Sequence, residues 1–163
     1  MFRKFLKTEN DVAALVMRLT LAIVFFPHGA QKVLGWFGGT GAGATIQFFS
    51  KMGLPPVITV LVMAAEFGGA LLLLVGFLTR LAALGIGCVM AAALIMVHSK
   101  VGFFMNWAGM QKGEGFEYHL LALGLCIAVL IKGGGALSVD QALTREDRVG
   151  AMAMPATPRP DRI

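Results

Sequence analysis

The sequence predicts an all-α integral membrane protein, folded as an antiparallel four-transmembrane-helix bundle with an interfacial helix in its first outer loop. Its 163 residues are 57% hydrophobic and 14% charged, with a mean hydropathy of +0.77, whereas soluble domains contain about 25% charged residues. Several apolar runs approach the roughly 20 residues that cross a bilayer as one helix. Most Lys and Arg residues lie near the N-terminus, at Arg80 and after the last run. This positive-inside distribution places both termini in the cytoplasm and does not resemble a nucleic-acid-binding stripe.

The chain is expected to form one membrane domain between two cytoplasmic tails. The tails are residues 1–11 and residues 144–163, and the second contains several prolines and is expected to be disordered. The domain covers residues 12–143. Its spans are expected at residues 12–34, 57–77, 80–98 and 117–132.

The segment between the first two spans predicts the interfacial helix. It begins with a glycine-rich stretch, and Ile46, Phe49 and Met52 then follow at three-residue spacing, which gives a short apolar stripe. Trp36 is expected to anchor this loop at the outer surface, and Trp107 lies in a second aromatic outer loop. The glycines lack the preceding strand and the G-x-x-x-x-G-K pattern of a phosphate-binding loop, so no nucleotide site is predicted.

One ionisable residue, Glu66, lies near the middle of the second span. A charge at that depth costs at least ~2.5 kcal/mol on insertion scales, so Glu66 is expected to face the bundle interior and to have a partner. The expected partners are Arg18 and His28 of the first span. The open alternative is that an Arg18–Glu66 pair only fixes the helix register. Lys32 is expected to extend its ammonium group to the outer surface.

Polar residues gather at the outer ends of the predicted spans, with Glu66 near the midplane and Arg18 below it. These outer residues are His28, Gln31, Lys32, His98, Glu117 and His119. We expect a cavity that opens toward the outer leaflet under the two aromatic loops. Histidine and buried glutamate both titrate near neutral pH, so this cavity suits proton-coupled chemistry. The competing interpretation is that His98 and His119 simply lie at the level of the lipid headgroups.

Metal and disulfide chemistry is not predicted. His28, His98 and His119 are chemically able to form a metal site with a carboxylate, or two of them to ligate haem, but no H-x-x-x-H or E-x-x-H pair lies on one helix. Cys88 and Cys126 lack C-x-x-C spacing and are expected to be small buried residues.

Several motifs of this sequence occur together in a known family. They are RLTLAIVFFPHGAQKVLGWFGG, MGLPP, AEFGGALLLLVGFLTRLAAL, a histidine that ends the third span, and FEYHLLAL leading into SVDQAL. The chain thereby resembles the DoxX family of small four-span bacterial membrane proteins, over about Met17 to Leu143. The resemblance implies polar positions at Arg18, His28, Gln31, Lys32, Glu66, Arg80, His98, Glu117 and Tyr118. His119 departs from the family pattern, in which proline is expected, so its role does not follow from the resemblance.

The resemblance implies the bacterial plasma (inner) membrane and a link to redox chemistry, since the family takes its name from a subunit of a quinone-linked thiosulfate oxidoreductase. One hypothesis is that this chain is the membrane subunit or partner of a quinone-linked redox system, with quinone at the outer polar residues and electrons from a partner protein. The alternative is a non-catalytic protein that binds, transports or anchors a small hydrophobic molecule or a partner protein. Both hypotheses leave the catalytic residues unassigned and expect the lipid bilayer as a partner. A redox protein or a second copy of the chain is the further partner considered.

Overall fold

The apolar stretches of the sequence form helices in the computed structural model of the protein, which describes residues 2–144. Within that range every regular element is helical and no strand forms, which confirms the all-α prediction. Three helical segments are long and apolar enough to cross a membrane: Val12–Val33, Pro56–Val75 and Thr79–Lys100. The expected disordered tail lies outside the described residues except for Thr144, which is helical.

The first long helix, α2, covers Val12–Val33. It begins where the carboxylate of Asp11 accepts hydrogen bonds from the backbone N–H groups of Ala13 and Ala14, 2.9 and 3.2 Å away. These bonds satisfy two of the donors that the first turn of a helix leaves without an internal partner. A short loop then leads to α3, which covers Gly41–Lys51, in the region where the sequence predicts an interfacial helix.

The second long helix is interrupted by a π-helical turn. It consists of α4 (Pro56–Met63), the turn η1 (Ala64–Gly68) and α5 (Gly69–Val75). A π turn inserts one extra residue into a helix, and such turns are frequent at functional sites. Glu66 lies within it, so the irregular backbone surrounds the residue that the sequence marks as most costly to bury. Gly76 ends α5 in the left-handed conformation, with a φ of 73°.

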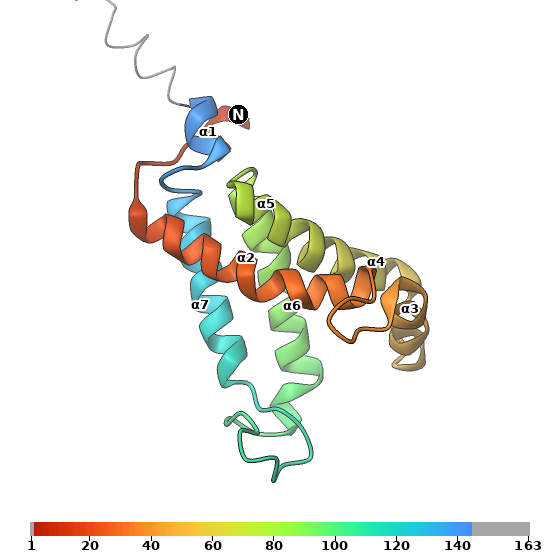
Figure 1. The fold of residues 1–163 in the computed structure, drawn as a ribbon. Helices are drawn as coiled ribbons and strands as arrows, with labels where there is room; N and C mark the ends of the chain where they lie inside the picture. Colours follow the sequence, from red (N-terminus) through yellow and green to blue (C-terminus); the bar gives the residue numbers. More distant parts are fainter. Residues whose placement is uncertain (1, 145–163) are drawn as a thin grey trace, which may run out of the picture.

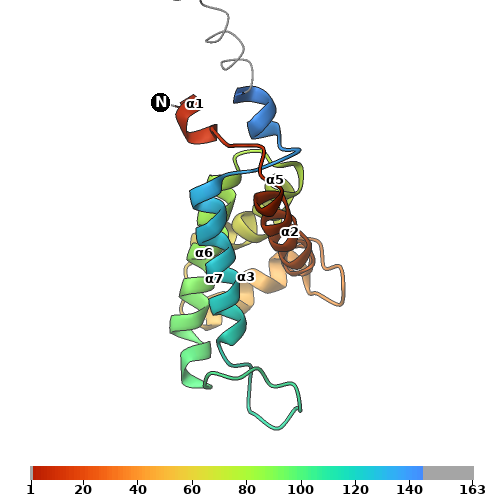
Figure 2. The same cartoon turned by 90° about the vertical axis from the view of Figure 1, so that its left-hand side faces the viewer.

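The long helices form two pairs that cross each other. Helices α6 (Thr79–Met96) and α7 (Glu117–Lys132) run side by side in opposite directions, joined by the turn η2 (His98–Lys100) and a long loop (Figures 1 and 2). Helix α2 packs against η1 and α5 and crosses the first pair steeply (Figure 1). The apolar core contains residues of α2, α5, α6 and α7, including Phe25 and Ile86, which are 1% and 0% exposed.

The residues expected as an N-terminal tail fold against the ends of the long helices. Helix α1 (Phe2–Leu6) lies at the same end of the molecule as the helical residues 139–144 (Figure 1). Arg80, at the start of α6, holds it there by donating a hydrogen bond of 2.9 Å to the backbone oxygen of Lys7. The beginning and the end of the described chain therefore share one face of the molecule.

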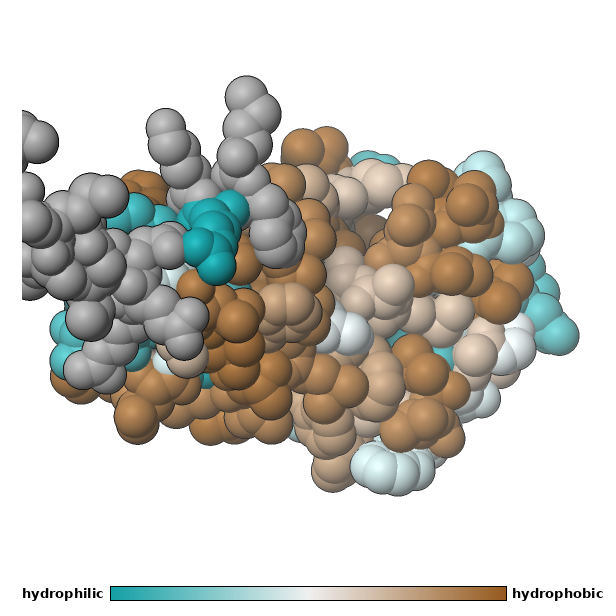
Figure 3. Space-filling model, turned by 90° about the horizontal axis from the view of Figure 1, so that it is seen from above, coloured by the Kyte–Doolittle hydropathy of each residue, from teal (hydrophilic) through white to brown (hydrophobic). Residues whose placement is uncertain are grey.

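The outward faces of the helices are largely apolar. Seen from above, hydrophobic residues cover much of the visible surface (Figure 3). Ile23, Leu121 and Ile131 are 66%, 72% and 71% exposed. Apolar surface of this extent marks a membrane interaction site, because exposing it to water is unfavourable.

Candidate functional site

The predicted site residues fall into three groups in the folded chain. The first group joins α2 to the π turn, and the second lies at the start of α7 and in the loop before it. The third group surrounds Arg18, toward the opposite end of α2. Gln31 stands apart from all three, because its Nε2 donates a 3.0 Å hydrogen bond to the backbone oxygen of Phe37 and so fixes the loop after α2.

The first group is an ion pair between Lys32 and Glu66. The Lys32 Nζ lies 2.5 Å from the Glu66 Oε2, and the two side chains are 25% and 5% exposed. The prediction that Arg18 or His28 holds Glu66 is therefore wrong, and so is the expectation that Lys32 reaches outward. The ammonium group turns inward because a nearly buried carboxylate without a partner costs more free energy than the loss of headgroup contacts. His28 is an exposed residue, although its backbone oxygen also accepts a 3.4 Å hydrogen bond from the Lys32 Nζ.

A close contact between α2 and the π turn brings the ion pair together. Gly29 is buried, and a Cβ atom added to it would lie 2.5 Å from the Cα of Phe67. The absence of a side chain at Gly29 therefore lets the two backbones touch. Lys32 is one turn further along α2, and Glu66 is next to Phe67 in the chain. The contact thus sets the two charged residues opposite each other.

The second group contains two buried polar atoms that have no hydrogen-bond partner among the described residues. They are the Tyr118 Oη and the His119 Nδ1, on adjacent residues in the first turn of α7. The His119 side chain is 5% exposed, and the Tyr118 and His119 rings lie 5.6 Å apart between centroids. Tyr118 also interacts electrostatically with Glu66, which connects this group with the ion pair. Buried polar atoms are nearly always satisfied, so two unpartnered atoms on adjacent residues indicate a missing polar partner.

The loop before α7 is fixed to these residues. The rings of His98 and His119 lie 4.1 Å apart between centroids, and the His98 Nδ1 donates a 2.8 Å hydrogen bond to the backbone oxygen of Glu114. The Glu117 Oε1 accepts a 2.9 Å bond from the backbone N–H of Met105. Glu117 and His98 therefore position the loop that covers the start of α7.

The third group shows that Arg18 has a structural environment of its own. Its side chain is buried, and its guanidinium donates hydrogen bonds to five backbone oxygens. Two belong to the last turn of α5, at Leu73 (2.6 Å) and Leu74 (2.9 Å), and three to the segment 134–137. The carbonyl end of a helix carries partial negative charge, so it attracts a cation. This arrangement replaces the predicted interior ion pair with Glu66.

Sequence reasoning missed one buried carboxylate, that of Asp140. Its oxygens accept from the backbone N–H groups of Leu78 and Thr79 at 2.9 and 3.0 Å and from the Thr79 hydroxyl at 2.7 Å, so Asp140 caps the start of α6 from a distant part of the chain. It also interacts electrostatically with Arg18. The only sequence signal is a single acidic residue in the short segment that follows the glycines 133–135.

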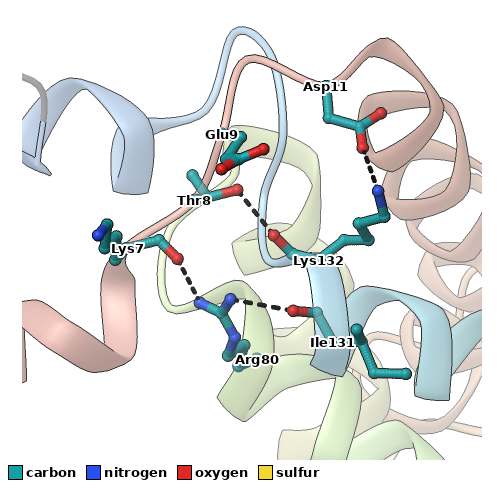
Figure 4. Close-up of a pocket in the computed structure, with 7 residues that line it drawn as sticks. All are labelled: Lys7, Thr8, Glu9, Asp11, Arg80, Ile131 and Lys132. Atoms are coloured by element: carbon teal, nitrogen blue, oxygen red, sulfur yellow. Dashed lines mark hydrogen bonds and ion pairs between the residues drawn. The ribbon is translucent and has the colours of Figure 1, made fainter.

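An open hollow of about 240 Å³ lies at the end of the molecule where α1 meets α6 and α7 (Figure 4). It is lined by Lys7, Thr8, Glu9, Asp11, Arg80, Ile131 and Lys132. Of the residues that the resemblance marks, only Arg80 contributes to it. The hollow is therefore separate from the polar residues expected to form a site at the outer ends of the spans.

The described residues contain no group of three or more His, Cys, Asp or Glu side chains arranged to hold a metal ion. Cys88 is exposed and Cys126 is buried, and both are free thiols. Burial of Cys126 agrees with the expectation of a small core residue, whereas exposure of Cys88 does not.

Comparisons with known proteins show that the chain belongs to one family. The family DoxX matches residues 13–99. The Inner membrane protein YqjF of Escherichia coli (strain K12) is 33% identical over 141 residues, which cover 86% of this chain and 99% of that protein. The "Putative oxidoreductase CatD" of Bacillus subtilis (strain 168) is 30% identical over 130 residues, which cover 80% of this chain and 86% of that protein. The Inner membrane protein YphA of Escherichia coli is 26% identical over 138 residues, covering 81% and 91%. No solved structure matches the chain.

Proposed function

This chain is a membrane protein of the DoxX family, and from that premise we propose that it binds a quinone head group at the start of α7 as the membrane component of a redox system. The observation that carries the proposal is the pair of buried, unpartnered polar atoms, the Tyr118 Oη and the His119 Nδ1, of which Tyr118 interacts electrostatically with Glu66 of the ion pair. A quinone carbonyl accepts hydrogen bonds, and both atoms are able to donate one.

The proposal places residues 12–143 in the bacterial plasma membrane, crossed four times, with both termini in the cytoplasm. In support, α1 and residues 139–144 lie at one end of the molecule, and the loop between α6 and α7 lies at the other (Figures 1 and 2). Helix α7 has 16 residues, or about 24 Å of helix, and its length is completed by the segments at its two ends. Helix α3 is proposed to lie at the outer interface. Two relatives named as inner membrane proteins support the location.

The charges near the site suit proton transfer. Reduction of a quinone to a quinol adds two electrons and two protons, one proton on each oxygen. The electrons come from a redox cofactor of a partner protein. Lys32 and Glu66 form an ion pair, Glu66 interacts electrostatically with Tyr118, and Lys32 is 25% exposed, so the ion pair connects the proposed site with the outside of the protein. The name of the relative CatD favours redox chemistry over a purely anchoring role.

Quinone retention by the purified protein tests this proposal. The wild type and two variants are purified in mild detergent and extracted into organic solvent, and quinone is measured by its absorbance change on reduction. Tyr118→Phe removes one hydroxyl and leaves the ring, whereas the control Thr20→Val removes an exposed hydroxyl that bonds within α2. The wild type and the control are expected to retain quinone, and Tyr118→Phe is expected to retain about five- to tenfold less, as the loss of one buried hydrogen bond predicts.

The measurement also separates the proposal from its alternative. Tyr118→Phe removes an unpartnered hydroxyl, so its thermal stability should equal that of the wild type. Equal quinone retention in all three proteins, or none in any of them, contradicts quinone binding at this site. A non-redox lipid or a protein that co-purifies in place of quinone favours a binding or anchoring function.

A further inference from the structure

The hollow between α1, α6 and α7 is lined by both positive and negative side chains that form no ion pair with the described residues. We propose that it binds the head group of a zwitterionic phospholipid that carries a phosphate and a primary ammonium group. The inference is independent of the quinone proposal, because the hollow is lined by Ile131 and Lys132 at the end of α7 and shares no residue with the start of that helix. Figure 4 shows the residues that line it.

The positive part of the hollow consists of Lys7 and one remaining donor of Arg80. The Arg80 guanidinium has five N–H groups, and four of them bond the backbone oxygens of residues 130, 5, 7 and 131. One N–H of Nη2 therefore stays available. The Lys7 ammonium is exposed and makes no hydrogen bond or ion pair with the described residues. Together these two groups offer a charged site for a phosphate oxygen.

The negative part of the hollow is Glu9. Asp11 already forms an ion pair, since its Oδ2 lies 2.9 Å from the Lys132 Nζ. Glu9 is exposed, and its carboxylate makes no hydrogen bond or ion pair with the described residues, although it interacts electrostatically with Lys132. A ligand that carries only negative charge leaves this carboxylate unpaired. A ligand with an ammonium group a few atoms from its phosphate pairs both charges.

The size and the position of the hollow fit a lipid. Its volume of about 240 Å³ is smaller than the roughly 300–1,000 Å³ of pockets that enclose a whole drug-sized ligand, so it suits a small head group whose chains remain outside. It opens beside Asp11, which begins α2, and Lys132, which ends α7, so it lies at the level where the membrane helices end. Ile131 lines the hollow and is 71% exposed, which offers an apolar contact toward the lipid chains.

Lipid binding to the full-length protein tests the inference. The protein is stripped of lipid in detergent and titrated with phosphatidylethanolamine, phosphatidylcholine or phosphatidylglycerol of identical chains, and bound lipid is counted by native mass spectrometry. Phosphatidylethanolamine is expected to bind about three- to fivefold more tightly than the other two, as a partly exposed ion pair predicts. The ammonium group of phosphatidylcholine is shielded by three methyl groups, and phosphatidylglycerol has no ammonium group, so neither pairs as closely with Glu9.

Two variants assign the preference to this hollow. Glu9→Gln should remove the advantage of phosphatidylethanolamine over phosphatidylglycerol, and Lys7→Gln should weaken binding of all three lipids. Lys112→Gln, in the loop at the opposite end, is the matched control and should leave all affinities unchanged. Equal affinities for the three lipids in the wild type, or an unchanged preference in Glu9→Gln, overturn the inference.

A soluble head group distinguishes a lipid site from a site for a free metabolite. Phosphoethanolamine without chains should compete only weakly with the lipid, because the contact at Ile131 is lost. Competition by phosphoethanolamine as strong as that of the intact lipid contradicts the lipid assignment. Thermal unfolding of each variant in detergent checks that the exposed substitutions leave the fold intact.

Discussion

The ion pair between Lys32 and Glu66 makes a quantitative prediction about stability. Glu66→Leu leaves the Lys32 ammonium without its carboxylate, and Lys32→Leu leaves a carboxylate that is 5% exposed without its cation. Breaking a buried pair costs about 3–5 kcal/mol, whereas replacing both partners with apolar residues is often neutral. Because Lys32 is 25% exposed, its ammonium regains part of its solvation in Glu66→Leu, and this variant should lose about 2–3 kcal/mol, whereas Lys32→Leu should lose about 3–5 kcal/mol. The double variant should lose less than the sum by about 1–3 kcal/mol.

Reversible unfolding measures this coupling. The four proteins of the cycle are titrated with SDS in mixed micelles, and loss of helix is followed by circular dichroism. A second cycle with Arg18→Leu and Glu66→Leu is the control, because Arg18 bonds backbone oxygens and not Glu66. In this control cycle, the free energy of unfolding lost by the double variant should equal the sum of the two single losses to within about 0.5 kcal/mol. Additive losses for Lys32 with Glu66, or strong coupling for Arg18 with Glu66, refute the assignment of the ion pair.

Three further changes probe the scaffold, each by the free energy of unfolding. Asp140→Ala should cost about 2–4 kcal/mol, since it removes the bonds to the backbone and hydroxyl of Thr79 at the start of α6. Gly29→Ala should cost about 1–3 kcal/mol, because its Cβ would lie 2.5 Å from a backbone atom of the π turn. The hydrogen bond from Lys132 lowers the pKa of Asp11 below its usual 3.8. The ionised carboxylate therefore stabilises the fold above about pH 4, and this contribution is lost as the pH falls further. Asp11→Asn should remove that part of the pH dependence of the free energy of unfolding.

Two of these changes have a matched control, and the third has an outcome that would contradict it. Gly43→Ala places its Cβ in open space and should leave the free energy of unfolding nearly unchanged, in contrast to Gly29→Ala. Thr144→Ala removes a hydroxyl near Asp140 that does not bond α6, so it should cost much less than Asp140→Ala. An Asp11→Asn variant whose stability falls in acid as steeply as that of the wild type contradicts the role given to the Asp11–Lys132 pair.

The positions of the long helices follow from local chemistry and are predictable. In the second helix, Pro55 and Pro56 precede the apolar run, and Gly76 ends it in a conformation that disfavours other residues. The π turn around Glu66 does not follow from the sequence pattern, because residues 64–68 are an ordinary apolar stretch apart from the carboxylate. The turn packs against Gly29 of another helix, a contact between distant parts of the chain that the pattern of residues 64–68 does not record.

The partner of Glu66 shows where sequence reasoning stops. Arg18 and Lys32 lie on the same predicted span, and each carries the positive charge that Glu66 needs in a partner. Their depth along the span does not decide between them. Arg18 is drawn away by the backbone oxygens of α5 and of the segment 134–137. Backbone oxygens occur at every position, so they leave no mark in the sequence. Asp140 was missed for the same reason, since its partners are mostly backbone N–H groups of a distant helix.

Photoaffinity labelling tests quinone binding at the start of α7 most directly. A quinone with a photoreactive group is added to the protein in lipid nanodiscs, irradiated, and located by peptide mass spectrometry. Saturable labelling within residues 116–123, competed by excess unreactive quinone and reduced in Tyr118→Phe, is the predicted result. Labelling that does not saturate and spreads over the exposed faces of the helices, or that saturates only at the end near Arg80, contradicts the proposed site.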